Sequence, residues 1–161
     1  MAWLEARPLD RRDLLLRLQL NSNPEILCVV RSAVSQLSEE LGFSAEECRA
    51  VTRAVDEALT NVIRHAYHGK RGRPIELSCR RIQDPADGGP REALEILLED
   101  RGVAADQKKM RSRSLDDIRP GGLGIHFIQQ SVDLMEYKRI ASTNRLRLLK
   151  YLRPVKQEIA R

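Results

Sequence analysis

Two polar side chains four residues apart, Glu57 and Asn61, are the first candidates for chemistry in this sequence. The apolar spacing around them predicts a helix, and residues four apart lie on the same helix face. An amide oxygen suits Mg²⁺, which prefers oxygen ligands, and a carboxylate one turn away can accept a proton from an attacking hydroxyl. On its own, such a pair is more often part of a solvated helix face.

A second candidate follows the apolar-rich run of residues 93–99, where Asp100 is followed one residue later by Gly102. A carboxylate at a strand end can accept a hydrogen bond from an exocyclic amine. A glycine beside it lets a flat ring approach the backbone closely, which would fit adenine. Taken alone, this pattern is usually a turn that ends a strand.

The third candidate is the glycine-rich segment Gly-Gly-Leu-Gly at residues 121–124, which is followed by apolar residues at helical spacing. Backbone N–H groups just before a helix N-terminus can bind phosphate, because the helix dipole favours an anion there. A glycine-rich loop by itself is more often a simple connection. It is not a P-loop, since no Gly-Lys-Ser/Thr follows.

Residues 101–120 separate the second and third candidates, and they are polar and basic without a clear period. A segment of this length is too long for a tight turn, so we expect a lid over the site. Phosphoryl transfer depends on positioning and charge stabilisation, and the lid offers five basic candidates for that task, each of which could equally be a solvated loop residue. These are Lys108, Lys109, Arg111, Arg113 and Arg119.

The elements that must position these residues follow from hydrophobic periodicity. Alternating or apolar-rich runs predict strands at residues 13–20, 75–82, 93–99, 134–140 and 145–152, and helical spacing predicts helices at 24–41, from Ser44 to near Gly69, and after Gly124. Asn23 is expected to cap the first helix, Ser44 and Glu47 form a capping-box pattern, and the turn-rich residues 84–90 are expected to connect a hairpin. The order of elements predicts an α+β fold in one domain, residues 1–161, with helices on one face of a sheet.

Composition limits the function further. Apolar residues make up 42% and charged residues 32% of the chain, a balance typical of globular proteins. The longest apolar run, residues 26–30, is far shorter than the ~20 residues of a membrane span, and the N-terminus lacks a signal-peptide pattern, so we expect a cytoplasmic protein. Three cysteines without a C-x-x-C pattern indicate neither a disulfide framework nor a zinc site, and we expect them to be buried.

Together, the candidate segments resemble the nucleotide-binding motifs of the GHKL ATPase superfamily, and within it the small anti-sigma factor serine kinases of bacteria. Residues 57–67 look like the N-box, Asp100-Arg101-Gly102 looks like the G1 box, and residues 119–125 look like the G2 box. The resemblance covers nearly the whole chain. It implies a Bergerat-type ATP-binding fold, a two-layer α/β sandwich with a mixed, mostly antiparallel sheet.

The resemblance also implies a role for each matching residue toward ATP and Mg²⁺: Asn61 ligates the metal, Glu57 is the general base, Asp100 reads adenine with Gly102 beside it, and Gly122, Leu123 and Gly124 bind the phosphates. The family often carries a Gly-Thr pair near the last strand, close to the adenine. This sequence reads Ser142-Thr143-Asn144, so Thr143 is assigned the adenine contact while the glycine is missing.

In the resembled family, the kinase holds a sigma factor and phosphorylates a STAS-domain anti-anti-sigma protein on serine or threonine, and members commonly dimerise. We therefore expect a sigma factor and a STAS protein as partners, and a homodimer. One alternative is a non-catalytic ATP-binding switch, which the presence of Glu57 disfavours. A nucleic-acid binder would suit the net charge of +5, but only 4% of residues are aromatic and no DNA-reading motif is evident.

Overall fold

The computed structural model of this chain describes residues 13–86, 88–105 and 123–153, and these residues form a two-layer α+β domain. Its elements follow in the order β1 (Leu14–Asn21), a 3₁₀ turn η1 (Pro24–Ile26), α1 (Leu27–Glu40), α2 (Ala45–Asn61), a π-helical turn η2 (Val62–Ala66), β2 (Pro74–Ala86), β3 (Gly89–Asp100), α4 (Leu123–Ser131), β4 (Leu134–Ile140) and β5 (Thr143–Tyr151). The predicted fold class is therefore confirmed.

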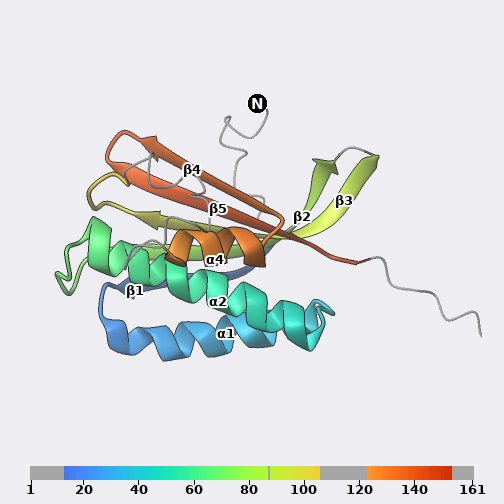
Figure 1. Cartoon of the computed structure of the whole chain (residues 1–161), viewed down its shortest axis with the longest axis horizontal. Coiled ribbons are helices and arrows are strands. Elements are labelled where there is room, and N and C mark those ends of the chain that lie inside the picture. Colours follow the sequence, from blue (N-terminus) through green and yellow to red (C-terminus); the bar gives the residue numbers. More distant parts are fainter. Residues whose placement is uncertain (1–12, 87, 106–122, 154–161) are drawn as a thin grey trace, which may run out of the picture.

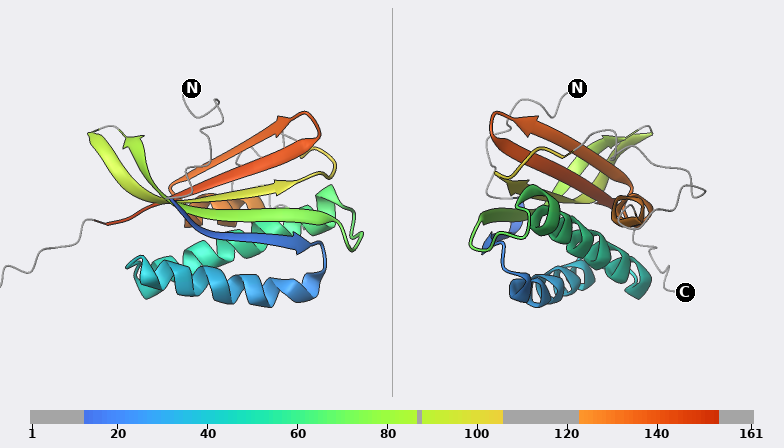
Figure 2. Two further views of the ribbon diagram at one scale, coloured as in Figure 1. Left: turned by 180° about the vertical axis from the view of Figure 1, so that it is seen from behind. Right: turned by 60° about the vertical axis from the view of Figure 1, so that its left-hand side comes forward.

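The five strands form one sheet in the order β1-β2-β3-β5-β4. The sequence predicted a mixed, mostly antiparallel sheet, whereas all four pairings between these strands are antiparallel. Figures 1 and 2 show α1, α2 and α4 together on one side of the sheet. Among the described residues no helix covers the other face, so the sheet has one covered and one open face.

Half-buried and exposed side chains alternate along β1. Its leucines at even positions are half-buried while the residues between them are exposed, as the period of two predicts. Leu18 lies opposite Leu77 of β2, which is fully buried in the core between sheet and helices. Burial of this apolar face fixes the register, because a slip by one residue would turn the leucines to solvent.

Helix α2 runs through the core and carries the first candidate residues. Its N-terminus has the predicted capping box, since the Ser44 hydroxyl accepts a hydrogen bond from the Glu47 amide at 3.2 Å and the Ser44 amide donates to the Glu47 carboxylate at 2.9 Å. Past Asn61 the chain widens into the π-helical turn η2, where the sequence predicted a continuous helix. Such turns are frequent at functional sites.

Two local predictions need correction. The turn-rich residues 84–90 do not form a long connection, because β2 and β3 stay paired through Pro85 and Pro90 as far as Ala86 and Gly89. This end of the hairpin projects beyond the other strands in Figure 1. Asn23 stands at the N-cap of η1 with Pro24 after it, as predicted, but its side chain accepts a hydrogen bond from the Gly72 amide at 3.1 Å and makes no capping hydrogen bond to the helix.

The cysteines differ from one another in burial. Cys48 and Cys79 are buried as expected, and burial raises the pKa of the Cys79 thiol to about 12. Cys28 is exposed, because it lies on the outer side of α1, so the expectation that all three are buried was wrong for this one. None of the helices described here is long and apolar enough to cross a membrane.

Candidate functional site

The end of α2 and the start of α4 bring three of the candidate residues together. A Cβ atom placed on Gly124 would lie 2.9 Å from Glu57 Oε2 and 3.6 Å from both polar side-chain atoms of Asn61. Glu57 and Asn61 thus face the same point at the N-terminus of α4, as their four-residue spacing predicted. Glycine permits this close approach, since a side chain at position 124 would force the Glu57 carboxylate to move.

Packing between α2 and α4 explains why this approach occurs. Ile128 of α4 is fully buried in the core beside the apolar face of α2. On the outer side, the guanidinium carbon of Arg53 lies 3.9 Å from the centroid of the Phe127 ring. Arg53 precedes Glu57 by one helical turn, so this cation–π contact joins the two helices next to the candidate residues and is worth about 0.5–1 kcal/mol at an exposed position.

Asp100 forms the other end of the site, at the end of β3 and on the covered face of the sheet. It is only 6% exposed, and its Oδ1 accepts hydrogen bonds from the Gly102 amide at 2.8 Å and the Asn144 side-chain amide at 2.7 Å. Burial raises the pKa of this carboxyl above its ordinary value, while the hydrogen bonds from Asn144 and Gly102 oppose that rise. Both hydrogen bonds end on Oδ1, so neither occupies Oδ2.

The backbone around Gly102 connects the two ends of the site. A Cβ on Gly102 would lie 2.5 Å from the carbonyl oxygen of Ala66 in η2, and the Val103 amide donates to that same oxygen at 2.9 Å. The contact that the structure shows at this glycine is therefore with η2, the turn that follows Asn61. The hydroxyl of Tyr67 adds a further link, because it accepts from the Arg101 amide at 2.9 Å and donates to the Pro74 carbonyl at 2.6 Å.

The remaining sequence candidates have different places. Leu123 is 40% exposed at the first turn of α4. Gly122 and the five basic lid candidates lie outside the described residues. Thr143 is half-buried at the start of β5, paired with Ile140, and no hydrogen bond between it and Asp100 is found among the described residues. The side chain that bonds to Asp100 is the next residue, Asn144.

Sequence reasoning missed Asn144, although a signal was present. β5 alternates, and Leu146 and Leu148 face the core, so Asn144 shares their side of the strand and Thr143 does not. Asn144 also lies directly opposite Asp100 in the β3–β5 register. The alternation along β5 therefore places Asn144 on the core side of the sheet and Thr143 on the opposite side.

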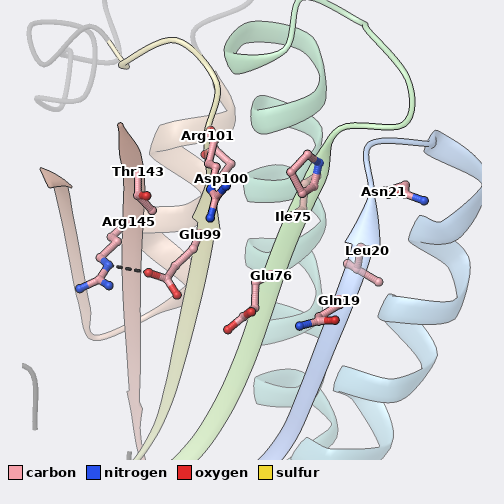
Figure 3. Close-up of a pocket in the computed structure, with 11 residues that line it drawn as sticks. Gln19, Leu20, Asn21, Ile75, Glu76, Glu99, Asp100, Arg101, Thr143 and Arg145 are labelled. Atoms are coloured by element: carbon pink, nitrogen blue, oxygen red, sulfur yellow. Dashed lines mark hydrogen bonds and ion pairs between the residues drawn. The ribbon is translucent and has the colours of Figure 1, made fainter. Parts of the chain in front are cut away.

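A hollow with a cavity volume of about 590 Å³ lies near the same strand ends and is shown in Figure 3. Its lining includes the candidates Asp100 and Thr143. Its other polar residues include Glu76, Glu99 and Arg145, which alternate with core residues and so belong to the open face of the sheet. The Glu99 and Arg145 side chains are paired with each other, as the dashed line in Figure 3 marks. This hollow is distinct from the space between Glu57, Asn61 and Gly124.

Comparison with known proteins identifies the family. Residues 20–150 match the histidine kinase-like ATPase domain. The chain belongs to this family. The matched range begins in β1 and ends in β5, so it includes both ends of the candidate site, and the resemblance to GHKL ATPases predicted from the three boxes is confirmed.

Among curated ATPase-domain relatives, serine-protein kinase RsbW of Bacillus pumilus is 28% identical over 130 residues, covering 76% of each chain. RsbW of Halalkalibacterium halodurans is 29% identical over 131 residues, covering 76% of this chain and 75% of the relative. A crystal structure of the RsbU and RsbW domains of a Mycobacterium tuberculosis protein superposes with a TM-score of 0.55 at 15% identity, covering 87% of this chain and 34% of that one. That likeness supports the fold alone.

Proposed function

We propose that this chain is an ATP-dependent anti-sigma factor that sequesters a sigma factor and phosphorylates a STAS-domain anti-anti-sigma protein on serine or threonine. The observation that carries the kinase part is the convergence of Glu57, Asn61 and Gly124 at the N-terminus of α4. A potential base, an oxygen ligand for a metal and a phosphate-binding helix terminus are the parts that phosphoryl transfer needs.

The residues at this point fit Mg·ATP. Glycine at position 124 lets the N-terminus of α4 approach the Glu57 and Asn61 side chains closely, so a phosphate bound at this helix terminus would lie beside both of them. Asn61 Oδ1 is a suitable ligand for Mg²⁺, which when bound would neutralise phosphate charge. The first N–H groups of α4 favour phosphate through the helix dipole, and Glu57 is placed to accept the proton of an attacking serine hydroxyl.

Asp100 supports adenine as the base. A nucleobase that donates from an exocyclic amine needs an acceptor in a dry site, and Asp100 is a nearly buried carboxylate whose Oδ2 receives neither of the two hydrogen bonds described above. Adenine has such an amine at its six position, which supports ATP as the nucleotide.

The partners rest on the relatives and on the resemblance. Several relatives named serine-protein kinase RsbW align over about three quarters of this chain, which supports a protein kinase rather than a metabolic one. The sigma factor, the STAS partner, the homodimer and the cytoplasmic location stay predictions. A non-catalytic ATP switch is the second candidate, and Glu57 beside Gly124 argues against it because a switch does not need a base.

The test is transfer of labelled γ-phosphate from Mg·ATP to candidate STAS-domain proteins. We expect wild-type transfer and its loss by at least about 100-fold in Glu57→Ala, since general-base catalysis contributes roughly 10²–10⁴-fold. Asn61→Ala should also lose transfer, because it removes the proposed Mg²⁺ ligand. Asp56→Ala is the matched control, because it removes the neighbouring carboxylate, which is paired with Arg31 at 2.8 Å on the α1 side. ATP binding without transfer by the wild type would favour the switch, and no ATP binding would refute the nucleotide site.

A further inference from the structure

Asn144 is the most heavily hydrogen-bonded side chain near the candidate site. It is 3% exposed and lies opposite Asp100 across the β3–β5 pair. Its amide nitrogen donates to Asp100 Oδ1 at 2.7 Å, to the Val103 carbonyl at 3.1 Å and to the Gly102 carbonyl at 3.3 Å. One side chain thus holds both the carboxylate and the backbone turn that follows it.

Two residues of β4 hold the other end of the Asn144 amide. The Tyr137 hydroxyl donates to Asn144 Oδ1 at 2.8 Å, and Arg139 Nη1 donates to it at 2.6 Å. Arg139 also reaches the Gly102 carbonyl at 3.0 Å, and the Ala105 amide donates to the Tyr137 hydroxyl at 2.9 Å. These contacts tie Asn144 to both sides of the turn after β3.

The orientation of the amide follows from its surroundings. With the nitrogen toward β3, the two N–H groups meet three oxygens, and the oxygen meets two donors. If the amide were turned by 180°, its oxygen would face the Asp100 carboxylate and two carbonyls, and its nitrogen would face the Arg139 guanidinium. Acceptors would then face acceptors and donors would face donors in a buried position, which costs free energy because none of these groups would be hydrogen-bonded.

Because its two hydrogens and its oxygen are all engaged, Asn144 has no remaining hydrogen-bonding capacity for a ligand. We propose that Asn144 is a positioning residue: it fixes Asp100 through Oδ1 so that Oδ2 is presented to the exocyclic amine of adenine, and thereby sets the preference for a purine with that amine. This inference rests on the proposed ATP site, and it differs from the adenine contact that the resemblance assigned to Thr143 because Asn144 acts through Asp100.

The test compares two nucleotides that differ only at the amine: ATP and purine riboside triphosphate, each with Mg²⁺. In the wild type we expect ATP to bind about tenfold more tightly or better, the range for a hydrogen bond to a charged group. In Asn144→Leu we expect that ratio to fall toward one, while the affinity for the analogue changes less than about threefold. Asn144→Thr retains one donor and should give an intermediate ratio.

Each outcome has a distinct meaning. Equal weakening of both nucleotides in the folded Asn144→Leu and Asn144→Thr variants would make Asn144 a structural residue and overturn the inference. Collapse of the ratio in Thr143→Ala but not in the Asn144 variants would return the role to Thr143. A wild type that binds both nucleotides equally overturns this inference but leaves the ATP site standing, whereas one that binds neither overturns the proposed function as well. Ser142→Ala, at an exposed neighbour, is the control.

Discussion

The two ends of the candidate site are built by different means. At the Asp100 end, side-chain hydrogen bonds join β3, β4 and β5, and Tyr67 and Ala66 connect them to the end of α2. At the Glu57 end, the packing of α4 against α2 and the contact between Arg53 and Phe127 set the geometry. The Asp100 end is therefore fixed by a network, while the Glu57 end depends on how two helices lie together.

The difference suggests how the two tasks are separated. Discrimination between bases needs groups with fixed orientation, because a buried acceptor must meet a donor at one place. Phosphoryl transfer needs several groups to approach a common point, and two helices can supply them from different parts of the chain. Substitutions at the two glycines, Gly124 and Gly102, should reveal the contrast, since each contacts one end of the site.

The largest effect is expected for Gly124→Ala. The new Cβ would lie 2.9 Å from Glu57 Oε2, so the carboxylate must move, and a displacement of about 1 Å can reduce a rate about 100-fold. The fold should tolerate the change, because the atom that moves is the end of a flexible side chain and alanine favours a helix by up to about 1 kcal/mol over glycine.

For Gly124→Ala, phosphotransfer assays measure the transfer rate, and urea unfolding measures the free energy of unfolding. Gln130→Ala, at an exposed position of the same helix, is the control for a general effect of altering α4. A large loss of stability in Gly124→Ala, or unchanged transfer, would contradict the view that this end is held by helix packing with space at Gly124.

Gly102→Ala should show the opposite pattern. Its Cβ would lie 2.5 Å from the Ala66 carbonyl oxygen and 2.6 Å from the carbonyl carbon, and backbone atoms cannot turn aside. We expect the free energy of unfolding to fall by about 1–3 kcal/mol, the usual range for overpacking. ATP affinity should fall with it, because the Asp100 turn must shift.

Urea unfolding tests this prediction directly. Val103→Ala changes the size of the next side chain, which is 56% exposed, and should leave stability nearly unchanged. If Gly102→Ala were as stable as the wild type, the close approach of η2 to the turn after β3 would not be a constraint on the fold.

The contrast also explains which features the sequence predicted. The period of β1, the capping box at Ser44 and the spacing of Glu57 and Asn61 are local signals, and the structure has them as expected. The extent of the β2–β3 hairpin was misjudged, because proline and glycine indicate turns even where paired strands continue past them. Local patterns therefore predicted the elements better than their ends.

The Asp100 end was harder to predict because its contacts join residues far apart in the chain. The close approach of Gly102 to Ala66, for example, joins residues 36 positions apart and has no local signal. The register that places Asn144 opposite Asp100 is not stated by the sequence. Had the alternation of β5 been extended backward from Leu146 and Leu148, it would have placed Asn144 toward the core.

The smallest expected effect concerns pH and the stability of the ligand-free protein. Burial raises the pKa of Asp100 above 3.8, so the folded state holds this proton more tightly than the unfolded chain. The contribution to stability is therefore full below about pH 3.8 and is lost as the pH rises through the raised pKa. In Asp100→Asn this dependence should be absent.

Urea unfolding across mildly acidic pH gives the difference in free energy of unfolding between the wild type and Asp100→Asn. This difference should change in favour of Asp100→Asn as the pH rises. A difference that is constant with pH would mean that the hydrogen bonds from Asn144 and Gly102 offset burial completely, and the network at this end would then be stronger than the structure implies.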